Sequence, residues 1–112
     1  MAKERRRAPR FKIHQMIEVG FGSESFMEAA GLNISESGIL CETAYFVDPG
    51  ARIFIRLSIT MDNDEKHINC EAVVARSEKS GDRYHTGIAF TDMNDADKSQ
   101  LARFLGKLEK KG

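Results

Sequence analysis

Two short motifs contain the residues of this sequence that are best suited to bind a ligand. The first is RRRAPR at residues 5–10, and the second is NISESG at residues 33–38. An arginine guanidinium is planar and permanently charged, and its fork of donors matches both phosphate oxygens and the O6/N7 edge of guanine. Small polar side chains and a glycine allow the backbone to approach a ligand closely. Together the two motifs predict a pocket for a ligand that carries guanine and phosphate.

The strand pattern between the motifs brings them together. Apolar and polar residues alternate over residues 11–21, the segment GSES at 22–25 predicts a turn, and a second strand is expected over residues 26–32. With the turn centred between residues 23 and 24, Phe11 lies opposite Glu36. The arginine motif therefore lies against the second motif, and an error of two residues in this register would not separate them.

The rest of the chain predicts a small barrel. A third strand is expected to begin near Gly38, and alternating patterns indicate strands over residues 53–59, 68–74 and 84–90, with a polar loop over residues 62–65. Six short strands joined by tight turns favour closure, because closure removes exposed edges. We therefore expect an all-β fold, a six-stranded antiparallel β-barrel with one C-terminal α-helix.

The expected helix covers residues 95–110. Leu101, Phe104, Leu105 and Leu108 follow the i, i+3, i+4, i+7 spacing of an amphipathic helix. Asn94 or Asp95 is suited to cap its first turn. We expect this helix to contribute to the barrel core, with a contact to a partner as the alternative.

Charge and length define the organisation of the chain. With 112 residues the chain is expected to form one domain. Residues 1–12 hold six basic residues and one acidic residue, a net charge of +5, so that residues 13–112 carry −5. We predict a flexible basic arm over residues 1–10 and a single barrel domain over residues 11–110. Without a long apolar run or a secretory pattern, the expected location is the cytoplasm, with no membrane insertion.

Nothing in the sequence suggests catalysis or metal binding. Cys41 and Cys70 fall on expected strands and are interpreted as reduced, buried thiols. The three histidines are scattered without metal-ligand spacing, and no nucleophile–base pair or carboxylate dyad is visible. Asp62 and Asp64 are interpreted as solvated turn residues. We therefore expect a protein that is not an enzyme and needs no cofactor.

The two motifs resemble the signature of a known family. Arg-x-x-x-Arg at the start of the first strand, followed by Asp/Asn-x-Ser-x-x-Gly, is similar to the signature of PilZ domains, and the segment at residues 84–90 resembles the last strand of that family. The resemblance extends over residues 4–108. The matching residues are Arg6, Arg10, Asn33, Ser35 and Gly38.

The resemblance implies a function and a set of site residues. It implies a barrel that binds the bacterial second messenger cyclic di-GMP, with an arginine segment that folds over the ligand and alters a surface read by an unidentified downstream protein. The arginines would hold guanine edges and phosphates, and the second motif would line the barrel side of the site. The ligand-binding residues implied in this way are Arg5, Arg6, Arg7, Arg10, Asn33, Ser35 and Gly38.

One position departs from the pattern of the family. Many relatives carry an aromatic residue on the fifth strand that stacks on a guanine, and this place falls near Ala75, with Arg76 next to it. Stacking would then come from an arginine plane or be missing.

Two other functions remain open from the sequence. A small barrel could use the basic arm on nucleic acid phosphates, although the acidic body and the lack of a run of exposed aromatic residues count against it. A PilZ-like interaction module that has lost ligand binding is the second alternative. Each motif also has a simple structural explanation, a solvated tail for the arginines and an Asx-type turn for residues 33–38.

Overall fold

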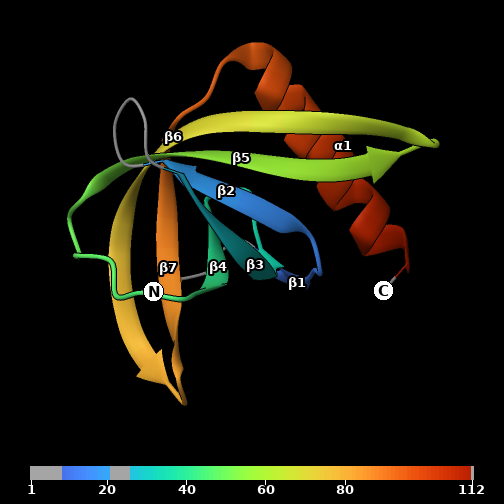
Figure 1. Cartoon of the computed structure of the whole chain (residues 1–112). Coiled ribbons are helices and arrows are strands. Elements are labelled where there is room, and N and C mark those ends of the chain that lie inside the picture. The colour runs from blue at the N-terminus through green and yellow to red at the C-terminus, as the bar shows by residue number, and fades with distance from the viewer. Residues whose placement is uncertain (1–8, 21–25, 112) are drawn as a thin grey trace, which may run out of the picture.

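Within the residues that the structure describes, seven β-strands precede one α-helix (Figure 1). This computed structural model describes residues 9–20 and 26–111. Phe21 and the expected turn at residues 22–25 lie outside the described residues. The elements are β1 (Phe11–Lys12), β2 (Met16–Gly20), β3 (Phe26–Ile34), β4 (Gly38–Thr43), β5 (Arg52–Met61), β6 (Asp64–Ser80), β7 (Arg83–Asp92) and α1 (Asp95–Lys111).

The strands close into the expected antiparallel barrel. Their order is β1-β3-β2-β5-β6-β7-β4, and an additional pairing of β3 with β4 closes the sheet. Since β1 and β2 both pair with β3 on the same side, they are two parts of one interrupted strand. The prediction of a six-stranded barrel with a C-terminal helix is confirmed, with one extra short strand.

The interruption between β1 and β2 has a packing cause. The Ile13 amide donates to the Leu32 carbonyl at 3.1 Å, and the Gly31 amide donates to the Gln15 carbonyl at 2.8 Å, so the chain stays attached to β3 outside the regular ladder. The Ile13 side chain is buried. A Cβ on Gly31 would lie 2.7 Å from Ile13 Cδ1, so the glycine leaves the space into which this isoleucine packs.

The β5–β6 hairpin is longer than the sequence suggested. The turn contains only Asp62 and Asn63, whose φ angles are 53° and 68°. Two successive positive φ angles are typical of the tight hairpin turn that Asn and Asp tolerate. Asp64 and Glu65, expected in a four-residue loop, belong to β6 instead. The polar composition concealed this part of the strand because its side chains lie near the exposed tip.

The helix lies against β6 beyond the end of β7 (Figure 1). Asn94 caps it, since its Oδ1 accepts the Asp97 amide at 2.8 Å. Leu101 and Phe104 are both 4% exposed and belong to the barrel core, as expected. No helix among the described residues is long and apolar enough to cross a membrane.

Polar contacts attach both halves of the helix to the β5–β6 hairpin. Near its start, Asp97 Oδ1 accepts the Asn69 amide at 3.3 Å. Towards its end, Lys107 Nζ lies 3.1 Å from Asp62 Oδ1, and Arg103 Nη2 lies 3.4 Å from Asp62 Oδ2. The hydrogen bond from Lys107 and its charge hold the pKa of Asp62 below its ordinary value. These contacts hold the helix against the β5–β6 hairpin.

Candidate functional site

Arg10 and Asn33 bring the two sequence motifs into contact. Arg10 Nη1 donates to Asn33 Oδ1 at 2.6 Å. The strands position this pair, because Lys12 lies directly opposite Asn33 in the β1–β3 ladder. The expected proximity of the motifs is confirmed for Arg10, whereas Arg5, Arg6 and Arg7 lie outside the described residues.

The expected register of the first hairpin is wrong by two residues. Phe11 lies opposite Ile34, not Glu36. Further along, Met16 lies opposite Ala30, so the register differs by one residue between the two ends of the hairpin. This shift occurs where the chain leaves the ladder between β1 and β2, an irregularity that a uniform hairpin does not include.

Ser35 shapes the loop between β3 and β4. It is only 1% exposed, and its Oγ accepts the Ser37 amide at 3.2 Å. The Ser35 amide donates to the Gly38 carbonyl at 2.9 Å. The turn explanation of this motif is therefore realised for Ser35, which holds the loop, while its neighbour Ser37 faces the hollow described below.

Gly38 is required by the packing of β4 on β7. A Cβ at this position would overlap the carbonyl oxygen of Ile88. Gly38 lies opposite Ala89 in the β4–β7 ladder. Its close approach is therefore to a neighbouring strand, which brings β7 up to the second motif.

A hollow of about 360 Å³ lies between the two motifs and β6–β7. This volume is within the range of small-molecule sites, roughly 300–1,000 Å³. Of the predicted site residues, the hollow takes in Arg10, Asn33 and Gly38 but not Ser35. Its lining is Arg10, Asn33, Ser37, Gly38, Leu40, Ala75, Arg76, Gly87, Ile88 and Ala89.

Arg76 enters the hollow through an irregularity in β6. Val74 lies opposite Ile88 and Arg76 lies opposite Gly87, so Ala75 is an extra residue on β6. A Cβ on Gly87 would lie 3.4 Å from both Cγ and Nε of Arg76, which shows that this side chain extends across the glycine. The sequence offers two signals for this arrangement: the place of Arg76 beside the expected stacking position of the family, and a glycine within the last predicted strand.

The charge of the hollow differs from that of the body. Within the described residues its lining contains Arg10 and Arg76 and no acidic side chain, whereas residues 13–112 carry −5. Amide and hydroxyl groups of Asn33 and Ser37 add hydrogen-bonding capacity. The site is therefore suited to an anionic ligand with hydrogen-bonding edges.

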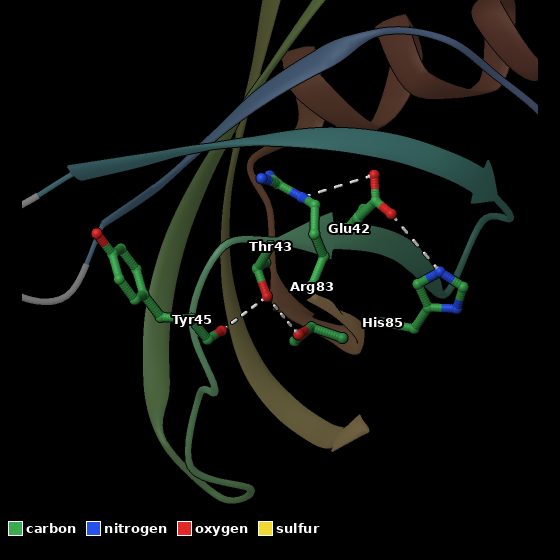
Figure 2. A network of polar contacts seen from close by, with 6 residues as sticks. Glu42, Thr43, Tyr45, Arg83 and His85 are labelled. Carbon is green, nitrogen blue, oxygen red and sulfur yellow. Dashed lines mark hydrogen bonds and ion pairs between the residues drawn. The ribbon is translucent and has the colours of Figure 1, made fainter. Parts of the chain in front are cut away.

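A polar network fixes β4, one wall of the hollow, to β7 (Figure 2). Thr43 Oγ1 lies 3.0 Å from Thr86 Oγ1 and donates to the Tyr45 carbonyl at 2.8 Å. Glu42 lies between Arg83 and His85, with Oε1 3.8 Å from Arg83 Nε and Oε2 4.0 Å from His85 Nε2. These contacts, together with the ladder, hold Leu40 and Gly87 in place on facing strands.

Nucleophilic and metal chemistry has little support in the described part of the chain. No cluster of three or more His, Cys, Asp or Glu residues there could hold a metal ion. Burial raises the pKa of the Cys41 thiol to about 12 and that of Cys70 to about 11. Both thiols are therefore protonated at neutral pH and poorly reactive.

The family model for the PilZ domain matches residues 4–107. The chain belongs to the PilZ domain family. The match covers both motifs, all seven strands and most of α1. A comparison with curated proteins finds no match.

Solved structures of other proteins share this fold at low sequence identity. The Bacillus subtilis inhibitor of motility MotI/DgrA has a TM-score of 0.85 at 17% identity, covering 97% of this chain and 53% of that one. The PilZ domain of Escherichia coli YcgR with c-di-GMP has a TM-score of 0.69 at 15% identity, covering 96% and 94%. The MrkH–c-di-GMP complex of K. pneumonia has a TM-score of 0.73 at 18% identity, covering 97% and 54%. This chain thus spans about half the length of MotI/DgrA and of MrkH.

The packing at Gly38 predicts a measurable loss of stability. Gly38→Ala forces β4 and β7 apart and should lower the free energy of unfolding by about 1–3 kcal/mol, measured by urea denaturation. Gly106→Ala is the matched control, because a Cβ there meets nothing within 4 Å and alanine favours a helix by up to about 1 kcal/mol. Equal stability of Gly38→Ala and the wild type would contradict the packing argument.

Proposed function

We propose that this PilZ domain is a cytoplasmic receptor for cyclic di-GMP and binds it in the hollow between the two motifs. The observation that carries the proposal is a hollow that holds the two cations Arg10 and Arg76. Both motifs border it, through the paired side chains of Arg10 and Asn33. The YcgR and MrkH structures, which contain c-di-GMP, support the choice of ligand.

Arg10 supplies the most direct contact. Its guanidinium is already oriented by Asn33 Oδ1 at 2.6 Å, so less side-chain freedom is lost when a ligand binds. The remaining donors can form a bidentate contact with a guanine O6/N7 edge or a phosphate. Arg5, Arg6 and Arg7 would add contacts from the arm, and Ser35 would act by holding the loop on which Ser37 lies.

Arg76 takes the role that an aromatic residue has in many relatives. Ala75 offers no ring, but the neighbouring Arg76 extends across Gly87 within the hollow. A guanidinium is planar and stacks on aromatic rings. Arg76 would therefore stack on one guanine and also balance part of the ligand's charge.

The ligand would act on a partner through the basic arm. Residues 1–10 contain four arginines, and the last of them, Arg10, lines the hollow. Bound phosphates would attract these arginines and order the arm over the site. The arm and the barrel would then present a surface that a downstream protein distinguishes from the ligand-free one.

The arginine contacts predict a loss of affinity. Arg6→Ala and Arg10→Ala should each weaken binding of cyclic di-GMP by about 1–3 kcal/mol, or roughly five- to hundredfold, measured by isothermal titration calorimetry. Lys79→Ala, an exposed cation of β6 outside the hollow, is the control and should leave the affinity unchanged. No binding by the wild type at about 0.1 mM ligand would refute the receptor proposal. Salt-sensitive binding of single-stranded DNA in its place would support the nucleic acid alternative.

Stacking by Arg76 can be separated from its charge. Arg76→Ala should weaken binding by about 0.5–2 kcal/mol, or roughly two- to thirtyfold. Arg76→Tyr keeps a planar surface and should recover affinity, whereas Arg76→Lys keeps only the charge and should not. The same calorimetric titration measures all three. The opposite order, with lysine better than tyrosine, would show that Arg76 acts as a point charge.

Ordering of the arm predicts protection from proteolysis. Saturating cyclic di-GMP should slow tryptic cleavage within residues 1–10 by about tenfold or more, because an ordered segment does not fit the protease, as followed by mass spectrometry. Cleavage after Lys110, far from the hollow, serves as the internal control. Unchanged cleavage of the arm in a protein shown to bind the ligand would exclude the ordering mechanism and leave the receptor proposal standing.

A further inference from the structure

A row of directly opposed residues crosses the outer face of the barrel. Gly20 of β2 lies opposite both Phe26 of β3 and Phe54 of β5, Phe54 lies opposite Glu71 of β6, and Glu71 lies opposite Asp92 of β7. Phe26 is 62% exposed and Phe54 is 51% exposed. One half of this row is therefore aromatic and the other half is acidic.

Gly20 makes room for the aromatic half. A Cβ on Gly20 would lie 2.7 Å from Cε1 of Phe26, so the Phe26 ring covers the glycine on the outer face of β2. The two rings on β3 and β5 thereby flank a strand position that has no side chain of its own. Exposed aromatic residues gathered in this way are typical of protein interaction sites.

Glu71 and Asp92 form the acidic half of the row. Like charges directly opposite one another on neighbouring strands are unfavourable. Glu18 and Glu28 are also opposed on the barrel, but there Arg56 lies 3.7 Å from Glu18. Among the described residues, no cation lies within 4.0 Å of the Glu71 or Asp92 carboxylate. This pair would be stabilised by a cation supplied from outside.

The row borders two hollows that adjoin each other. The larger, about 670 Å³, takes in Phe54, Glu71 and Asp92. The smaller, about 360 Å³, lies between the end of β7 and α1 and has Leu101 and Leu105 in its lining. Both include Asp92, so the aromatic, acidic and aliphatic parts of the surface adjoin one another. Two cations, Arg52 in the larger hollow and Lys98 in the smaller, also belong to the lining. They are outnumbered by the three carboxylates of Glu36, Glu71 and Asp92.

We propose that this surface docks a partner protein, which binds through a segment that has a lysine or arginine flanked by apolar side chains. The surface runs from Phe26 and Phe54 across Glu71 and Asp92 to the helix groove at Leu105. The cation would lie over the Phe54 ring and between the two carboxylates. The apolar neighbours would cover Phe26 on one side and the α1 groove on the other. The net charge of −5 on residues 13–112 favours such a basic partner and disfavours nucleic acid or anionic lipid.

This surface is separate from the site of the proposed function. The residues that line its hollows include none of those that line the hollow of Arg10 and Arg76. Its test therefore needs no cyclic di-GMP, and either proposal can fail without the other.

A labelled amphipathic peptide of leucine and lysine is a suitable probe, and fluorescence anisotropy measures its binding to the full chain. We expect a Kd below about 100 μM and little binding of the corresponding leucine–glutamate peptide. The double variant Glu71→Gln/Asp92→Asn should weaken binding at least about tenfold, although removal of the repulsion should keep its melting temperature at or above that of the wild type. Phe54→Thr should also weaken binding, since threonine suits a strand but offers no ring.

The matched control is Glu78→Gln/Asp82→Asn, which removes two exposed charges from β6 and the following turn, outside both hollows. It should bind the lysine peptide within about twofold of the wild type.

Equal affinity of the wild type and the Glu71/Asp92 variant, or equal losses in the two double variants, would overturn the proposal. Sedimentation analysis would also overturn it if the wild type self-associates and the Glu71/Asp92 variant is monomeric, since a second copy of the chain would then occupy the surface. A gain of more than about tenfold in peptide affinity on removal of residues 1–8 would assign the surface to the chain's own arm and overturn it as well.

Discussion

Strand β3 is paired along both of its edges, with β1 and β2 on one side and β4 on the other, and this double pairing is the constraint on which the rest of the structure depends. It closes the barrel, so no edge of β3 is open. It also fixes Asn33 next to Lys12, which is what places Arg10 against the Asn33 side chain. The candidate site is therefore a consequence of this pairing. The second motif begins on β3 and the arginine motif directly precedes β1, so the two motifs meet when β1 pairs with β3.

Closure also explains the positions of the glycines around the site. Gly38 brings β4 against the Ile88 carbonyl, and Gly87 lies beneath the Arg76 side chain. Neither glycine has a positive φ, so conformational freedom is not the reason for their presence. Each instead removes a Cβ where two neighbouring strands or a long side chain must come close. Four small residues from β4, β6 and β7 line the hollow, and the space in it is the space that larger side chains would fill. They are Gly38, Ala75, Gly87 and Ala89.

The sequence predicted most of the fold because the barrel strands alternate regularly. The isoleucines of β5 and the spacing of Leu101 and Phe104 identified a strand and a helix whose inward faces are buried as expected. The first hairpin was predicted with a register error of two residues, because nothing in the local pattern shows that the chain leaves the ladder near Ile13. The resemblance points to Arg76 beside the expected stacking position, but the extra residue at Ala75, which shifts β6 against β7, is revealed only by the paired strands. Alternation in one strand carries information about burial, whereas bulges depend on two strands at once.

The loop between β3 and β4 connects the candidate site to the helix groove. Ser37 lines the hollow of Arg10, and its neighbour Glu36 lines the groove beside α1. The loop is short, and the Ser35 hydroxyl holds it from within by accepting the Ser37 amide. The Ser37 carbonyl in turn accepts the amide of Phe90 at 2.9 Å. Phe90 lies near the end of β7 and lines the groove beside α1. The candidate site and the helix groove therefore come together at one place, because the same short loop and the end of β7 supply lining residues to both.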